Sequence, residues 1–283
     1  MDSFESIQLI SHGELNKIPF EALIDKDGNY VVQTKNVNYQ PALSFITASY
    51  LKKPSYKNSW TGFGISEGSE QSLKGSINEL KDLAAKTKGQ LLFNNNTNAS
   101  NLFQYAKDSR ILHLALHSKV NLESPLYSEL LLFEEQVTAS EIYNQDIQSD
   151  LVVLSACDTG FGKIEKGEGI MSFSRAFTYA GAKSTVNSLW EVPDIETAKL
   201  MRMFYDNIDR GMQKHQALAM AKQTYINSSD DHLLRHPFFW AGFVVSGDIS
   251  PIHKPASKKA YIWVALGLML IILFYLYRRR LGI

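Results

Sequence analysis

Residues 151–162 read LVVLSACDTGFG, an apolar run that ends in a glycine-rich segment. The beginning of this run is almost continuously apolar and β-branched, which is typical of a strand buried inside a parallel sheet. Two other runs have the same character, ILHLAL at 111–116 and STVNSLW at 184–190. Strands of this kind need helices over both faces, so the pattern predicts a mostly parallel α/β sheet between two helical layers.

Short apolar strands alternate with amphipathic helices along the rest of the chain. We expect further strands at 6–10, 62–65, 90–93, 129–133 and 243–246, besides the strand at 151–156. We expect helices at 72–89, 171–181, 195–208 and 212–226, with Asp194 as the N-cap residue of the helix at 195–208. The sequence has no internal repeat, and residues 1–248 are predicted to form one domain.

The composition is that of a folded globular protein. The chain has 283 residues, 45% of them hydrophobic, and its 29 basic residues balance 29 acidic ones. A net charge of zero gives no general reason to bind nucleic acid, so we expect no nucleic-acid partner. Cys157 is the only cysteine, which excludes an intrachain disulfide and a multi-cysteine metal site.

The C-terminal end has the pattern of a membrane anchor. Residues 260–277 carry no charged side chain, lysines precede them, and three arginines lie in the basic tail at 278–283. About 20 apolar residues cross the core of a bilayer, so we predict a single transmembrane helix at 260–277, after a linker at 249–259. The arginines and the lysines indicate opposite orientations, which leaves the side of the membrane that holds the domain open.

Two predicted strands lead directly into reactive side chains. His117 follows the run at 111–116, and Cys157 follows the run at 151–156. Sites in open parallel sheets lie at the carboxyl ends of the strands, so both side chains lie at one edge if their strands are neighbours. A nearby imidazole can take the proton of a thiol and later protonate a leaving amine. The pair therefore indicates a cysteine nucleophile with a histidine general base and acid.

The backbone around this pair suits acyl transfer. Glycines at 160, 162, 167 and 169 permit a tight loop, and the N–H groups of Cys157 and Ser118 are candidate donors to an oxyanion. Two alternatives stay open for this segment. Cys157 can instead be a small buried side chain, and Asp158-Thr159-Gly160 resembles the aspartic-protease motif, which needs a second copy that this chain does not have.

His113 and His117 are four residues apart in HLALH, a spacing that on a helix would suit a metal. On a strand the same spacing separates them by roughly 13 Å, so we expect no shared metal site. We expect His113 to be a hydrogen-bonded histidine of the core. We also expect no nucleotide cofactor, because the glycine-rich segment after Cys157 fits neither the GK[ST] nor the GxGxxG pattern.

Longer stretches around these residues match a known pattern. They are ILHLALHS at 111–118, LVVLSACDTG at 151–160, NSLWEVPD at 187–194 and HPFFWAGFVVSGD at 236–248. Together they resemble the CHAT domain, a bacterial branch of the caspase-like cysteine peptidases. The resemblance implies a three-layer caspase-like sandwich, a His117–Cys157 dyad and hydrolysis of peptide bonds without a metal or cofactor. It also implies an early hairpin at 12–23.

The same resemblance implies further site residues and partners. Asp158, Glu168, Trp190 and Asp194 are expected to shape the substrate cleft. Ser118 stands where caspase-like enzymes usually carry glycine, and serine resists a positive φ, which puts the oxyanion contact of its N–H in doubt. Such domains usually follow tetratricopeptide repeats, so we expect a repeat protein as a partner and an N-terminally truncated domain.

The sequence thus predicts a membrane-anchored cysteine endopeptidase that attacks a protein or peptide through a thioester acyl-enzyme. The alternative is a catalytically degenerate caspase-like scaffold that binds a peptide or a repeat-protein partner. A reactive thiol of lowered pKa would distinguish the enzyme from the scaffold.

Overall fold

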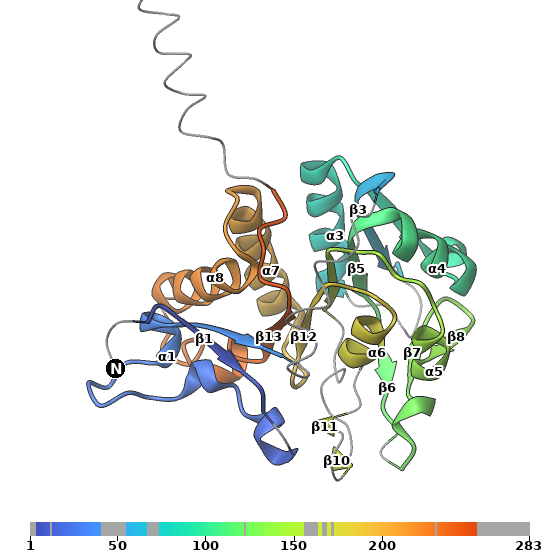
Figure 1. Cartoon of the computed structure of the whole chain (residues 1–283). Coiled ribbons are helices and arrows are strands. Elements are labelled where there is room, and N and C mark those ends of the chain that lie inside the picture. The colour runs from blue at the N-terminus through green and yellow to red at the C-terminus, as the bar shows by residue number, and fades with distance from the viewer. Residues whose placement is uncertain are drawn as a thin grey trace, which may run out of the picture.

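An eight-stranded sheet lies at the centre of the described structure, and helices cover both of its faces (Figure 1). This computed structural model describes residues 4–11, 13–40, 55–66, 74–121, 123–155, 164–165, 169–170, 173–229 and 231–253. Across the sheet the strands are, in order, β1 (Ser6–Leu9), β2 (Asn36–Tyr39), β13 (Phe243–Gly247), β12 (Ser184–Ser188), β9 (Leu151–Leu154), β5 (Ser109–Ala115), β3 (Asn58–Gly64) and β4 (Gln90–Phe93). Neighbouring strands run parallel, except β12 and β13, which are antiparallel.

The three central strands are the three apolar runs of the sequence. Every side chain of β9 and β12 is buried, and in β5 only Arg110 is partly exposed. Strands that are apolar on both faces are stable only where both faces are covered, which places them at the middle of the sheet. The predicted mostly parallel α/β sheet is confirmed.

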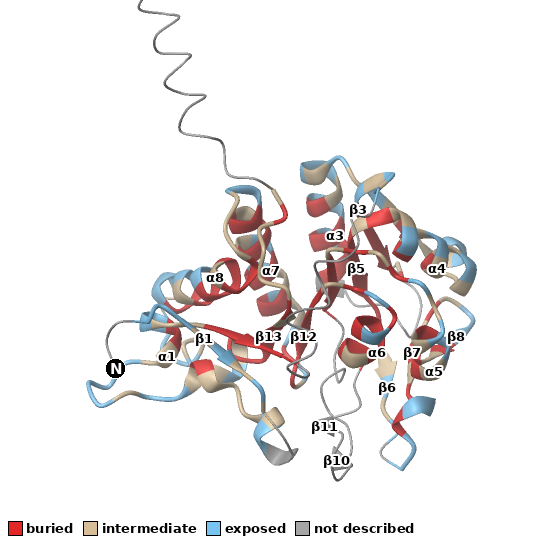
Figure 2. Ribbon diagram, in the orientation of Figure 1, coloured by how far each residue is buried: buried red, intermediate tan, exposed pale blue. Residues whose placement is uncertain are grey.

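Two helical layers cover the sheet. One consists of α3 (Lys74–Thr87), α7 (Asp194–Asp209) and α8 (Lys214–Ser228), and the other of α4 (Ala99–Asp108), α5 (Ala139–Tyr143) and α6 (Phe173–Tyr179). Successive residues of a strand point to opposite faces, so Ile111 of β5 belongs to the first core and Leu112 to the second. Figure 2 shows the buried residues gathered along the sheet and on the helices beside it.

Smaller elements complete the described part of the chain. An antiparallel sheet contains β6 (Ser118–Lys119), β7 (Glu129–Leu131) and β8 (Gln136–Thr138), while β10 (Ile164–Glu165) pairs with β11 (Gly169–Ile170). The short helices are α1 (Val31–Thr34) and the 3₁₀ helices η1 (Gly13–Lys17), η2 (Phe20–Ala22), η3 (Asn94–Asn96), η4 (Pro125–Tyr127) and η5 (Pro237–Phe239).

Several predicted elements differ from the structure in their ends or their place. The predicted strand at 62–65 begins earlier, because Asn58 pairs with Ser109. The run at 129–133 is a strand only over β7 and belongs to the small sheet. Both β2 and α4 escaped prediction, since two of the four residues in NVNY of β2 are asparagines, which are depleted in strands, and half of the ten residues of α4 are polar.

Two finer predictions are wrong. Helix α7 begins at Asp194 itself, and Pro193 is its N-cap residue, since the fixed φ of proline suits the start of a helix. Residues 13–23, expected in a hairpin, contain the 3₁₀ helices η1 and η2 instead. These tight turns carry Glu21 inward, where its Oε1 lies 3.0 Å from Nζ of the buried Lys222.

Among the described helices, none is long and apolar enough to cross a bilayer. The predicted transmembrane helix at 260–277 and the basic tail at 278–283 lie outside the described residues. Of the predicted linker, residues 249–253 are described and contain neither helix nor strand.

A polar network is buried in the core between β5 and α7. His113 is fully buried, with Nδ1 2.9 Å from Tyr205 Oη and Nε2 2.9 Å from Ser155 Oγ. The Trp60 indole N–H donates to Tyr205 Oη at 3.3 Å. Glu79 of α3 places Oε1 3.4 Å from His113 Nε2, and neither carboxyl oxygen has a hydrogen-bond partner among the described residues. The prediction that His113 is a hydrogen-bonded core histidine is confirmed.

Burial decides the protonation of this network. It lowers the pKa of His113 to about 3. It also raises the pKa of Glu79 to about 8, against the charge of Arg202 and together with that of Asp194. The imidazole is therefore uncharged and the carboxyl protonated at neutral pH, so the core holds two neutral groups rather than two buried charges.

We expect the Glu79→Gln variant to be more stable than the wild type, by a margin that grows as the pH rises from about 4.5 to about 8. The unfolded chain loses the Glu79 proton near pH 4.5 and the folded protein keeps it until about pH 8, so the wild type loses stability in this interval. The difference in free energy of unfolding should grow by on the order of 5 kcal/mol and then level off. Urea denaturation at several pH values measures it, and a pH-independent difference would contradict a protonated Glu79.

Candidate active site

Three neighbouring strands end at the sheet edge where predicted site residues follow them. Leu114 of β5 lies opposite Leu154 of β9, and Leu154 lies opposite Asn187 of β12. Three residues beyond these positions the chain reaches His117, Cys157 and Trp190, respectively. The carboxyl ends of parallel strands meet at one edge, so the strand adjacency that the predicted dyad requires is present.

The described chain stops just before the proposed nucleophile. Cys157, Asp158 and Glu168 lie outside the described residues, and their roles remain predictions. Ser155 is described, and its N–H donates to the Leu114 carbonyl oxygen at 3.1 Å. This bond extends the pairing of β5 with β9 by one residue toward Cys157.

His117 is half-buried and its backbone is held by the small sheet. The Leu131 N–H donates to the His117 carbonyl oxygen at 2.9 Å, and Ser118 pairs with Leu130 in the β6–β7 ladder. Pairing with β7 thus fixes the main chain at the histidine, and the residue as a whole stays partly exposed. An imidazole that a substrate can reach can exchange a proton with it.

Ser118 fits its place without backbone strain. It lies in β6 and is absent from the residues with positive φ, which in the described part of the chain are Lys88, Asn94 and Glu134 besides glycines. Serine therefore replaces glycine here in an extended conformation that any residue adopts. Its role as an oxyanion donor stays a prediction.

Trp190 and Asp194 follow the end of β12 beside these residues. The Trp190 indole N–H donates to the Phe238 carbonyl oxygen at 2.9 Å, and the Ser188 hydroxyl donates to the Trp190 carbonyl oxygen. Trp190 is half-buried against the core, and Asp194 is half-buried in the first turn of α7. A carboxylate there interacts favourably with the helix dipole, and its charge also acts on Glu79 in the core below.

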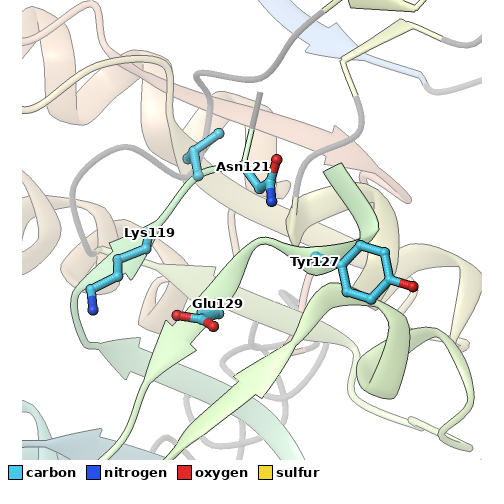
Figure 3. Close-up of a pocket in the computed structure, with 5 residues that line it drawn as sticks. Lys119, Asn121, Tyr127 and Glu129 are labelled. Atoms are coloured by element: carbon cyan, nitrogen blue, oxygen red, sulfur yellow. The ribbon is translucent and has the colours of Figure 1, made fainter. Parts of the chain in front are cut away.

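A hollow of about 460 Å³ lies at the small sheet and was not foreseen from the sequence. Its lining includes Lys119 of β6, Glu129 of β7, and Asn121 and Tyr127 from the connection between these strands (Figure 3). Lys119 lies directly opposite Glu129 in the ladder. The signal available in the sequence was only that Lys119 follows His117 by two residues.

The described part of the chain contains no cluster of histidine, cysteine, aspartate or glutamate that could hold a metal ion. The described residues in this region include a partly exposed histidine, His117, whose main chain is held by β7, and a hollow with polar lining at the small sheet. This arrangement suits proton transfer to and from a bound polar substrate.

The chain matches one protein family over most of its length and two named proteins over about half of it. The CHAT domain matches residues 2–248. Tetratricopeptide repeat protein 28 of Homo sapiens is 30% identical over 135 residues, which are 48% of this chain and 5% of that protein. The Mus musculus protein of the same name is 29% identical over 135 residues with the same coverage, so the match spans a small fraction of these relatives.

Solved structures share the fold at low sequence identity. Separase of Saccharomyces cerevisiae, in its complex with securin, has a TM-score of 0.58 and 14% identity, covering 82% of this chain and 14% of that one. The Arg-specific cysteine proteinase gingipain R has a TM-score of 0.58 and 10% identity, covering 87% of this chain and 63% of that one. The match over residues 2–248 and the shared architecture show that the chain belongs to the CHAT domain family and has the α/β fold of the caspase-like cysteine peptidases.

Proposed function

We propose that this protein is a cysteine endopeptidase in which Cys157 is the nucleophile and His117 the general base and acid. The observation that carries the proposal is the parallel pairing of β5 with β9, with Leu114 opposite Leu154. Each of the two residues follows its paired leucine by three positions, so adjacent parallel strands would lead both of them to one sheet edge. Membership of the CHAT family and a fold shared with separase and gingipain R support the same chemistry.

The proposed reaction has two steps. His117 takes the proton of the Cys157 thiol, sulfur bonds to the carbonyl carbon of the substrate, and the carbonyl oxygen becomes an oxyanion near the N–H groups of Cys157 and Ser118. The carbon–nitrogen bond then breaks, His117 protonates the leaving amine, and a thioester remains. Water, deprotonated by His117, attacks the thioester and releases the acid and the free thiol.

The cleft would be formed by the loops that surround this edge. Asp158, Glu168, Trp190 and Asp194 are the proposed contacts, and the three carboxylates would favour basic side chains of the substrate. The hollow at Lys119 and Glu129 would receive a polar substrate residue, since it presents both charges side by side. The class of substrate is therefore a protein or peptide with polar residues near the cleaved bond.

We expect Cys157→Ala to lower peptide cleavage by at least about a thousandfold, because it removes the atom that forms the thioester. His117→Ala should lower it by at least about a hundredfold, because the thiol loses its base and the amine its acid. Cleavage of a random peptide library, followed by mass spectrometry, measures both effects. Far-UV circular dichroism checks that each variant remains folded.

The matched control is His232→Ala, which changes an exposed histidine in the turn between α8 and η5. It should cleave the library as the wild type does. Full cleavage by a folded Cys157→Ala variant would refute the nucleophile. A His117→Ala variant that cleaves the library as fast as the wild type would refute the dyad.

A second candidate function is a scaffold that binds a peptide or a repeat protein through the same edge. Ser118 favours it, because the glycine usual after the histidine is replaced and the backbone there is extended. The relatives named as tetratricopeptide repeat proteins point to a repeat-containing partner, and separase was solved bound to securin. Alkylation separates the candidates, since a peptidase thiol reacts with iodoacetamide well below pH 8 and a buried scaffold cysteine does not.

We further propose that residues 260–277 anchor the domain to a membrane as a single-pass helix. The support is the sequence alone, an uncharged stretch with lysines before it and arginines after it. The residues at 249–259 would then connect the anchor to the domain.

We expect the full chain to stay with membranes after extraction at alkaline pH, because that treatment removes proteins bound only to the surface. A variant that ends at residue 253 should move to the supernatant. Immunoblotting of both fractions measures the partition. A full chain that is released as completely as the shortened one would contradict the anchor.

A further inference from the structure

Ser155 is held at two points where the chain leaves β9. Its N–H donates to the Leu114 carbonyl oxygen at 3.1 Å, and its Oγ lies 2.9 Å from His113 Nε2. Both contacts come from β5, the strand that also leads to His117. Ser155 precedes Cys157 by two residues, so its position decides where the following segment starts.

The positions of the hydrogen atoms in this network follow from the groups that can only donate. The Trp60 indole has only an N–H, so it donates to Tyr205 Oη. Among the described neighbours of the fully buried Tyr205, His113 Nδ1 at 2.9 Å accepts the tyrosine hydrogen. A neutral imidazole then carries its proton on Nε2, which donates to Ser155 Oγ. The chain of donors runs from Trp60 through Tyr205 and His113 to Ser155.

This chain of hydrogen bonds joins separate parts of the fold. Trp60 lies in β3, Tyr205 in α7, His113 in β5, and Ser155 directly after β9. The His113 ring stacks on Tyr205 with ring centroids 5.7 Å apart and an interplanar angle of 23°. Packing on one side and hydrogen bonds at both nitrogens leave the imidazole a single orientation.

We propose that His113 is a positioning residue which, by its hydrogen bond to the Ser155 hydroxyl, fixes the start of the segment that carries Cys157. The inference rests on the proposed function, since it assigns His113 a part in aligning the nucleophile with His117. A leucine or phenylalanine would fill the same apolar core without placing polar groups there. His113 instead places a polar ring in the core, where it takes part in a buried network of hydrogen bonds. Glu79 Oε1 lies 3.4 Å from His113 Nε2, and the Glu79 carboxyl has no hydrogen-bond partner among the described residues.

The test uses Cys157 as its own reporter, because it is the only thiol of the chain. The rate of alkylation by iodoacetamide is measured by mass spectrometry on the full-length protein. We expect His113→Leu and Ser155→Ala each to slow alkylation about tenfold, as the loss of one well-placed hydrogen bond would. The double variant should be no slower than either single one, because both changes break the same bond.

Two further variants separate positioning from general stability. His113→Gln should stay within about threefold of the wild-type rate, because its amide N–H can still reach Ser155. The matched control is His215→Leu, which removes another buried histidine, with Nε2 3.1 Å from Ser6 Oγ of the edge strand β1. It should lower the melting temperature as His113→Leu does and leave the alkylation rate unchanged.

The outcomes distinguish this inference from the proposed function. On a library peptide that the wild type cleaves, His113→Leu should lower kcat with KM unchanged. Suppose that the wild type cleaves peptides and that the His113→Leu variant is alkylated and turns over at the wild-type rates. This result would overturn the positioning role and leave the peptidase function intact. Additive effects of the two single variants would overturn the positioning role as well. If no peptide is cleaved but the alkylation rate depends on His113 and Ser155, the proposed peptidase function is refuted and the positioning role of His113 is supported.

Discussion

The parallel pairing of β5 with β9 holds two of the central strands of the sheet in one register. Both strands are buried on both faces, and their side chains alternate between two apolar cores. A slip by one residue would turn His113 away from Tyr205 and into the core that contains Leu112 and Leu114. The register with Leu114 opposite Leu154 is therefore set by packing, and it also sets which residues follow the two strands at the sheet edge.

Two kinds of polar group are buried in the core. Lys222 and Glu21, and likewise Lys214 and Asp248, form buried ion pairs at 3.0 Å that join α8 to the N-terminal turns and to the end of β13. Each pair satisfies its charges locally. The group around His113 is neutral instead, and it connects four elements below the predicted dyad. A neutral network of directional bonds orients its members without a buried charge, which suits a support for reactive side chains.

The solved relatives share this architecture at 10–14% identity, so most of the side chains that build it have changed. What survives such change is the order and direction of the strands, since these follow from where apolar runs lie. Reactivity instead depends on particular atoms at the sheet edge, which a shared fold does not fix.

The α/β class, the three central strands and the two residues that follow β5 and β9 were predictable from the sequence, because continuous apolar runs reveal strands covered on both faces. The sequence also indicated that His113 is a core residue, since it sits inside such a run. The sequence did not predict the order of the strands, because it depends on which strands pair in the folded sheet. It also did not predict the exact start of α7, which depends on the local backbone geometry around Pro193. The packing of the folded chain brings Trp60, Glu79 and Tyr205 to His113, and it lets Lys119 and Glu129 line a hollow at the small sheet. These residues come from distant segments or from short polar strands, and their contacts arise only when the sheet and its helices pack together.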